Sequence, residues 1–208
     1  MSQSYKVRKV KANNVAIGNR AKTGGRTDSQ PPVMEPIAKV SFPQGAGEAP
    51  VVSSRGIFLS YRRQDAAPYA RSLQLQLRER FPEVRVFMDL DSIEAGLDFA
   101  EVIQEAVGSC AVLVVLIGRQ WATLTDEQGC RRLDDPDDLV RSEVHAALDR
   151  GVRVIPVLAD GARPLRPEQL PAELRTLARL NALELSYSRY EYDADRLLDL
   201  IRRVLAAA

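Results

Sequence analysis

Short apolar runs alternate with amphipathic segments from residue 56 to residue 205, and this alternation predicts an α/β fold. Five runs have the length and composition of β-strands. The runs at 111–117 and 152–158 are almost entirely apolar, which is typical of strands buried on both faces of a parallel sheet. The predicted strands cover residues 56–61, 84–88, 111–117, 152–158 and 182–185.

The segments between these runs repeat apolar residues at the spacing of amphipathic helices. Gly151 follows the third of them, where a helix often ends in a left-handed residue. Strands and helices in regular alternation indicate a parallel sheet between helical layers. We therefore predict a flavodoxin-like three-layer sandwich with five strands in the order 2-1-3-4-5 and a ligand site at their carboxyl ends. The predicted helices cover residues 68–80, 99–107, 137–150 and 193–205, with a short helical stretch near 174–177.

The first 54 residues differ from the rest in charge and composition. Residues 1–50 carry eight Lys or Arg against three Asp or Glu, a net charge of +5, whereas the remainder carries twenty-one against twenty-five, a net charge of −4. Residues 1–26 contain no acid, and residues 27–54 are rich in Pro, Gly, Ser and Ala, as linkers are. We expect a basic N-terminal segment at 1–26, either a β-hairpin or a tail, then a linker at 27–54 and one domain at 55–208.

The composition argues against membrane and metal proteins. The longest apolar run is far shorter than the roughly 20 residues of a membrane helix, and the polar, basic start does not resemble a signal peptide. Two cysteines and the single His145 are too few for a zinc site built on thiolates or histidines. We expect a cytoplasmic protein without metal, in which Cys110 is a small buried hydrophobe.

Common nucleotide-binding motifs are missing from the sequence. It contains neither GxGxxG nor GxxxxGK[ST], which argues against a Rossmann dehydrogenase and a P-loop enzyme. The acidic stretch at 134–138 (DDPDD) suggests either a metal site or a loop that caps the next helix. We favour the cap, with Asp137 or Asp138 as the capping residue.

Four segments form a more specific pattern. SYRRQD at 60–65 follows the first predicted strand, and VFMDLDSIEAGLDF at 86–99 follows the second. SCAVLVVLIGRQW at 109–121 spans the third strand, and RRLDDPDDLVRSEVHAAL at 131–148 enters the helix before the fourth. In this order and spacing they closely resemble a bacterial TIR (Toll/interleukin-1 receptor) domain. The resemblance covers about residues 55–206 and leaves residues 1–50 outside it.

The resemblance carries expectations about function. Many bacterial and plant TIR domains cleave the nicotinamide–ribose bond of NAD⁺, so it implies an NAD⁺ nucleosidase with NAD⁺ as substrate and no cofactor. Self-association through TIR–TIR contacts often completes these sites. The segment 89–99 resembles the BB loop, which the family uses for assembly and for closing over ligand. The expected assembly residues are Asp91, Ser92, Ile93, Gly96 and Phe99.

The resemblance assigns the catalytic glutamate of the family to Glu143. Nicotinamide in NAD⁺ is already a cationic leaving group, so no general acid has to protonate it. A carboxylate beside the ribose can stabilise the oxocarbenium-like charge that develops. The alternative is a solvated glutamate that pairs with a nearby arginine such as Arg141.

Further candidates for substrate binding lie at the strand exits. Arg62 and Arg63 can pair with a pyrophosphate, or else form structural ion pairs with Asp65, Asp89 or Asp91. Trp121 can stack on a base or on nicotinamide, or instead cover a helix surface. Phe58 or Tyr61 can border the pocket, although one of them must face the core. The expected substrate-binding residues are Phe58, Ser60, Arg62, Arg63, Asp89 and Trp121.

One departure from the family pattern argues against catalytic activity. Several active relatives place a tryptophan four residues before the glutamate, where this chain has Leu139. The alternative function is therefore a non-catalytic interaction module that assembles a signalling complex through its BB loop. We expect His145 to lie at or near the surface.

The basic segment at 1–26 is the other unassigned feature. Its cations suit phosphate contacts, but it offers only Tyr5 for base stacking, so we do not expect nucleic acid as its partner. We favour docking to a recruiting protein or a solvated tail, in a protein of bacterial signalling or defence.

Overall fold

The structure, a computed structural model, describes residues 56–88 and 98–208. The predicted segments at 1–26 and 27–54 lie outside the described residues. So do four of the assembly candidates, Asp91, Ser92, Ile93 and Gly96, and the substrate candidate Asp89.

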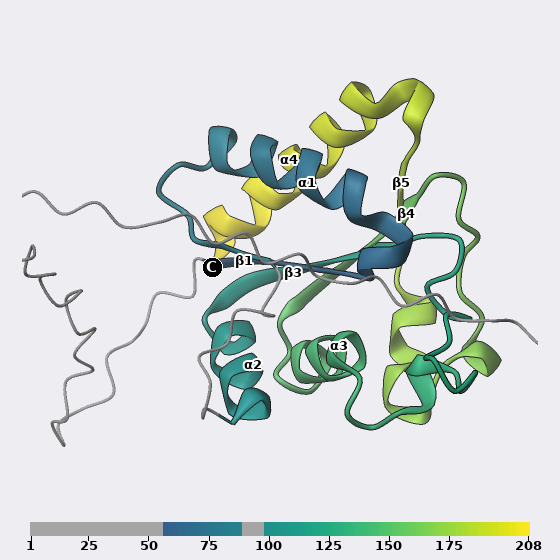
Figure 1. Cartoon of the computed structure of the whole chain (residues 1–208). Coiled ribbons are helices and arrows are strands. Elements are labelled where there is room, and N and C mark those ends of the chain that lie inside the picture. Colours follow the sequence, from purple (N-terminus) through teal and green to yellow (C-terminus); the bar gives the residue numbers. More distant parts are fainter. Residues whose placement is uncertain (1–55, 89–97) are drawn as a thin grey trace, which may run out of the picture. The chain divides into compact units, whose positions relative to one another are not determined.

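Five parallel strands form the sheet in the order β2-β1-β3-β4-β5, which confirms the predicted topology (Figure 1). Strand β3 lies at the centre of the sheet and pairs with β1 on one side and β4 on the other. The strands are β1 (Gly56–Tyr61), β2 (Val86–Phe87), β3 (Cys110–Ile117), β4 (Arg153–Ala159) and β5 (Leu183–Leu185).

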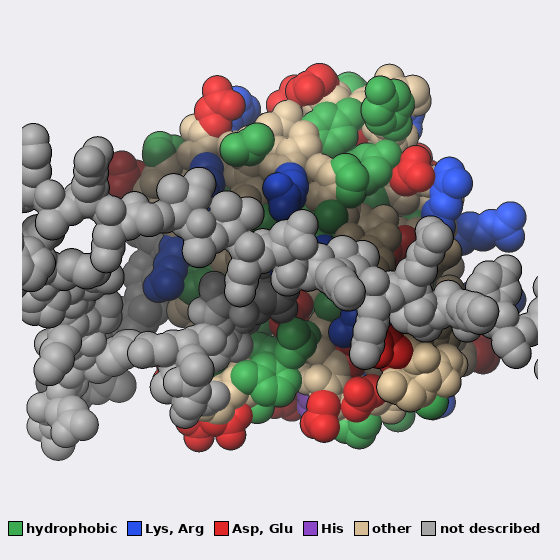
Figure 2. All heavy atoms as spheres, in the orientation of Figure 1, with side chains coloured by type: hydrophobic (Ala, Val, Ile, Leu, Met, Phe, Trp, Pro, Cys, Tyr) green, Lys and Arg blue, Asp and Glu red, His purple; other side chains and the backbone are tan. Residues whose placement is uncertain are grey.

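Helices cover both faces of the sheet, with α1 and α4 on one side and α2 and α3 on the other (Figure 1). Short 3₁₀ helices occupy the connections from β3 to α3, from β4 to β5 and from β5 to α4. Basic and acidic side chains are interspersed on the face of the described residues seen in Figure 2. The helices are α1 (Arg63–Arg80), α2 (Phe99–Gly108), α3 (Leu139–Asp149) and α4 (Tyr190–Ala207), with 3₁₀ helices η2 (Arg132–Asp134), η3 (Pro167–Gln169), η4 (Ala172–Arg179) and η5 (Tyr187–Arg189).

The alternation of side chains along β1 decides which residues reach each face. Ile57, Leu59 and Tyr61 pack in the core beneath α1 and α4. Phe58 packs in the core beneath α2 and α3. Because successive residues of a strand point to opposite faces, Ser60 shares the side of Phe58 and points toward α3.

Two predicted boundaries were wrong. Helix α1 begins at Arg63, five residues before the predicted start at Pro68, because the carbonyl of Arg62 accepts from the backbone N–H groups of Asp65 and Ala66. Pro68 therefore lies inside the helix. Strand β2 spans two residues instead of the predicted 84–88, since a turn bond from the N–H of Val84 to the carbonyl of Phe81 precedes it.

Proline and glycine occupy positions that suit them. Pro156 lies in β4, where it pairs with β3, and the pairing of β4 with β5 starts only at Val157, after the residue that lacks an N–H. Gly151 ends α3 with a φ of 68°, as predicted. Within the described ranges no helix is long and apolar enough to cross a bilayer.

Candidate functional site

A buried hydrogen bond joins the end of β1 to the first turns of α3. The hydroxyl of Ser60 donates to the Oε2 atom of Glu143 over 2.6 Å, although 83 residues separate the two in the chain. Ser60 is 1% exposed and Glu143 is 8% exposed. This short contact places the predicted catalytic carboxylate at the carboxyl edge of the parallel sheet, where ligands bind in open α/β folds.

The start of α3 sets the position of Glu143. Asp138 is the N-cap, and its Oδ1 atom accepts from the N–H of Arg141 at 2.9 Å, which confirms the cap predicted for the DDPDD stretch. Glu143 is the fifth residue of the helix. The cap therefore fixes the rotation of the turn that directs Glu143 toward β1.

Arg62 forms a buried ion pair at the same edge. Its guanidinium donates to both carboxylate oxygens of Asp138, at 2.9 and 3.0 Å, and both side chains are 1% exposed. Its Nε donates to the carbonyl of Trp121 at 2.9 Å, and Arg132 approaches Asp138 to 3.2 Å from the solvent side. The structure thus supports the ion-pair alternative for Arg62, with Asp138 as a partner that the sequence analysis did not name.

Two aromatic substrate candidates are packed into the core. Trp121 is 1% exposed, and the Arg62 guanidinium lies 5.6 Å from its ring centroid. The indole N–H of Trp121 is buried and has no hydrogen-bond partner among the described residues. Phe58 is also 1% exposed and stacks on Phe87 with ring centroids 6.3 Å apart. In this structure both rings pack in the core next to the site and do not face solvent.

The remaining described candidates are spread along the same edge. Arg63 is exposed at the start of α1, and Phe99 is half-buried at the start of α2, against the core beneath α2 and α3. The structure therefore brings Ser60, Arg62 and Trp121 into the neighbourhood of α3 and leaves Arg63 at the surface.

Arg141, the alternative partner of Glu143, is engaged elsewhere. Its guanidinium donates to Glu173 and to the carbonyl oxygens of Leu133 and Asp134. A backbone hydrogen bond, reinforced by Arg141, lowers the pKa of Glu173 below its usual value. Arg141 thus joins α3 to η4, and Glu143 is left to face β1.

Two other positions on α3 were singled out in the sequence, His145 and Leu139. His145 is exposed, as expected from its place on a different helix face. Leu139, where several active relatives carry tryptophan, is half-buried against the core beneath α2 and α3.

The sequence analysis missed a second contact between α1 and the exit of β3. The Oδ1 atom of Asp65 accepts from the N–H of Gln120 at 3.0 Å. A side chain at Gly118 would meet the Asp65 carboxylate at 2.4–2.5 Å, so only glycine fits there without a shift. The sequence does contain both residues, Asp65 in SYRRQD and Gly118 in LIGRQW. Neither motif, however, indicates that the two loops are in contact.

The Glu143 carboxylate decides which chemistry this site can carry out. A carboxylate held by a serine hydroxyl in a poorly solvated place can stabilise a developing positive charge more strongly than in water. No group of three metal-ligating side chains occurs in the part of the chain that the structure describes.

Comparisons with known proteins agree with this geometry. A family model described as a TIR domain matches residues 57–198. NAD(+) hydrolase sarm1 of Drosophila melanogaster is 25% identical over 159 residues, which cover 76% of this chain and 11% of that protein. NAD(+) hydrolase tir-1 of Caenorhabditis elegans is 23% identical over 129 residues, which cover 62% of this chain and 12% of that protein.

The chain thus spans 11–12% of the length of these two curated relatives. Among solved structures, the TIR domains of the activated Roq1 resistosome, which directly recognises the pathogen effector XopQ, superpose with a TM-score of 0.53 and 16% identity. That match covers 71% of this chain and 99% of the other, and it shows the shared fold alone.

Proposed function

The chain belongs to the TIR domain family, and on that premise we propose that it is an NAD⁺ glycohydrolase with Glu143 as its catalytic residue. The observation that carries the proposal is the buried hydrogen bond from Ser60 to Glu143. It holds one carboxylate at the carboxyl edge of the sheet. Two relatives that carry the name NAD(+) hydrolase support the same activity.

The proposed reaction needs no metal and no general acid. The bond between the nicotinamide nitrogen and C1′ of the ribose breaks, and both electrons leave with neutral nicotinamide. Glu143 stabilises the oxocarbenium-like ribose that develops. Water then adds to C1′ and releases one proton to solvent, which yields ADP-ribose. A cyclic isomer forms instead when the adenine of the same molecule captures C1′.

Ser60 acts in this scheme as a positioning residue. Its hydroxyl occupies one lone pair of Oε2 and limits the rotation of the Glu143 side chain. The Glu143 carboxylate is thereby held in one orientation for the ribose. Catalytic groups held in one orientation avoid the cost of reorganisation in the transition state.

We further propose that self-association activates the enzyme, in bacterial signalling or defence. The solved relative is an assembled resistosome that contains TIR domains. The sequence resemblance assigns the segment 89–99 to assembly. NAD⁺ is the proposed substrate, and residues 1–26 are the proposed contact for a recruiting protein.

Measuring the loss of NAD⁺ and the release of nicotinamide by HPLC tests this function. Concentrated wild-type protein should consume NAD⁺, and Glu143→Gln should lower turnover by about 100-fold or more, since it removes the charge but keeps the shape. Ser60→Ala should lower kcat by about tenfold and leave KM nearly unchanged, because it disturbs only the orientation of Glu143.

The control is His145→Gln, an exposed change on the same helix, which should keep full activity. Equal turnover by Glu143→Gln and the wild type would remove Glu143 from its role. Intact NAD⁺ after enforced clustering of the wild type would refute the enzyme as a whole.

A non-catalytic interaction module is the second candidate, favoured by Leu139 in place of tryptophan. In that case Gly96→Pro or Asp91→Arg should abolish assembly with partners, while the wild type leaves NAD⁺ intact. Consumption of NAD⁺ by the wild type excludes this alternative.

A further inference from the structure

A cavity opens at the carboxyl edge of the sheet, between the exits of β3 and β4. It has a volume of about 420 Å³, which is within the size range of small-molecule sites. Neither Ser60 nor Glu143 lines it. Its walls are made by Gly118, Arg119, Ala122, Thr123, Gly161, Ala162, Arg163, Pro164, Leu165, Arg166 and Gln169.

The charge of this cavity is entirely positive. Three of its lining residues are arginines, and none is Asp or Glu. Arg119 pairs with Asp160, next to the cavity, at 3.6 Å. No carboxylate in the described ranges lies within ion-pair distance of Arg163 or Arg166. Two guanidinium groups thus remain available to an anion from outside the chain.

The loop after β4 is shaped before any ligand binds. Asp160 and Gly161 both adopt positive φ, 52° and 71°, which is unusual for an aspartate. The Asp160 carbonyl accepts from Nε of Arg119 at 2.6 Å, and its carboxylate accepts from the Tyr69 hydroxyl at 3.3 Å. Pro164 restricts the backbone beside Arg163. Contacts from the exit of β3 and from α1 therefore hold the loop that carries Arg163 and Arg166.

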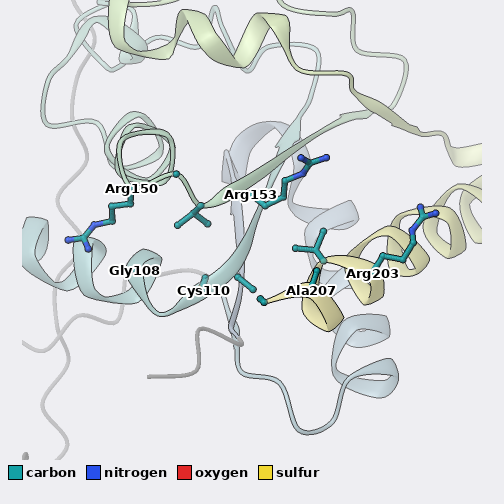
Figure 3. A pocket seen from close by; sticks show the side chains of 11 residues that line it. Gly108, Cys110, Arg150, Arg153, Arg203 and Ala207 are labelled. Carbon is teal, nitrogen blue, oxygen red and sulfur yellow. The ribbon is translucent and has the colours of Figure 1, made fainter. Parts of the chain in front are cut away.

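A larger cavity at the opposite edge of the sheet serves as a comparison. It has about 730 Å³ and also contains three arginines. Arg150 turns away from Arg153 and Arg203 toward α2, where its Nε donates to Gln104 at 2.8 Å (Figure 3). Arg150 also sits at the C-cap of α3, whose dipole it complements. Arg150 thus points away from the other two arginines, so the three guanidinium groups of that cavity do not converge on one place.

We propose that the cavity between the exits of β3 and β4 binds the phosphate groups of a small ligand. Guanidinium groups match phosphate oxygens with two parallel hydrogen bonds, which makes arginine well suited to a diphosphate. The position also agrees with the rule that open α/β sheets bind ligands beyond the carboxyl ends of their strands. This site does not depend on the NAD⁺ cleavage proposed above.

Titration of the full ¹⁵N-labelled chain with inorganic pyrophosphate at low ionic strength tests the proposal. The amide signals of Gly118, Gly161 and Arg163 should shift. The double variant Arg163→Gln/Arg166→Gln should weaken binding by about tenfold or more. The matched control Arg175→Gln/Arg179→Gln removes the same charge from exposed positions on η4 and should bind as the wild type does.

Parallel titrations with ADP and with adenosine separate the sources of the phosphate. Tighter binding of ADP than of pyrophosphate, with none of adenosine, indicates a nucleotide ligand, whereas equal binding indicates the diphosphate alone. No shift of the three amide signals at low salt would overturn the site. An equal loss of affinity in both double variants would also overturn it, since binding would then reflect net charge.

Discussion

At the scale of single residues, burial separates side chains that the sequence alone treats alike. Ser60, Arg62, Asp138 and Glu143 are all buried polar groups, and all four take part in hydrogen bonds at the edge where the strands end. Burying polar groups is costly without such partners. Their concentration at one edge of the sheet is the structural feature on which the proposed catalytic site rests.

The two cysteines give a prediction at this scale. Burial raises the pKa of the Cys110 thiol to about 12, whereas Cys130 is exposed. Because the thiolate is the reactive form, iodoacetamide at pH 8 should label Cys130 and leave Cys110 unmodified in the folded chain. Peptide mass spectrometry should find one label per native chain and two after unfolding in urea.

Cys130→Ser provides the control, since its folded form should take no label. Labelling of Cys110 in the folded chain at the rate of Cys130 would contradict the burial of this thiol.

At the scale of elements, the ion pair between Arg62 and Asp138 connects the exit of β1 to the start of α3. Asp138 serves both as the N-cap of α3 and as the partner of Arg62. Arg62 lies two residues after Ser60, and Asp138 lies five residues before Glu143. The ion pair and the Ser60–Glu143 hydrogen bond are therefore two links between the same pair of elements.

A double-mutant cycle measures this connection. Asp138→Asn should destabilise the fold by about 3 kcal/mol, because it leaves the buried charge of Arg62 without its partner. Arg62→Met should cost less, because Arg132 still lies 3.2 Å from Asp138. The double variant should lose less than the sum by about 1 kcal/mol or more. Urea unfolding, followed by the fluorescence of Trp121 and by circular dichroism, gives these free energies.

The exposed pair of Arg202 and Asp199, 2.8 Å apart, supplies the comparison. The cycle of Arg202→Met and Asp199→Asn should show a coupling of about 0.5 kcal/mol or less, as surface pairs do. Simple additivity of the Arg62 and Asp138 changes would show that the two elements are not coupled through this pair.

At the scale of the whole molecule, the proposed activation by self-association requires contacts between copies of the chain. If self-association completes the site, nicotinamide release per mole of protein should rise with protein concentration. Fusion to a dimeric coiled coil should raise the activity of dilute protein by about tenfold or more, since it increases the effective concentration. HPLC over a dilution series, with light scattering on the same samples, measures both quantities.

Glu143→Gln in the same fusion is the control, because clustering should not rescue a chain without the carboxylate. Constant activity per chain across the series, with a monomer throughout, would contradict activation by assembly and leave the hydrolase proposal standing.

Much of the fold could be predicted because its signals are local. The apolar runs of β3 and β4 and the periodicity of the helices record burial residue by residue. The cap at Asp138 and the terminator Gly151 also lie beside the helix ends that they define. The start of α1 was predicted wrongly, because Pro68 resembles a boundary while the bonds to the Arg62 carbonyl are set by the packing at the end of β1.

The sequence by itself therefore determined the order of the elements, the parallel topology and the candidate glutamate. Only the tertiary structure decided that Ser60 holds Glu143, that Arg62 pairs with Asp138 and that Trp121 is buried. The contacts of Ser60 and Arg62 join residues 83 and 76 positions apart. Periodicity tells which face of an element is buried, but the partners of a buried polar group depend on which loops the folded sheet brings together.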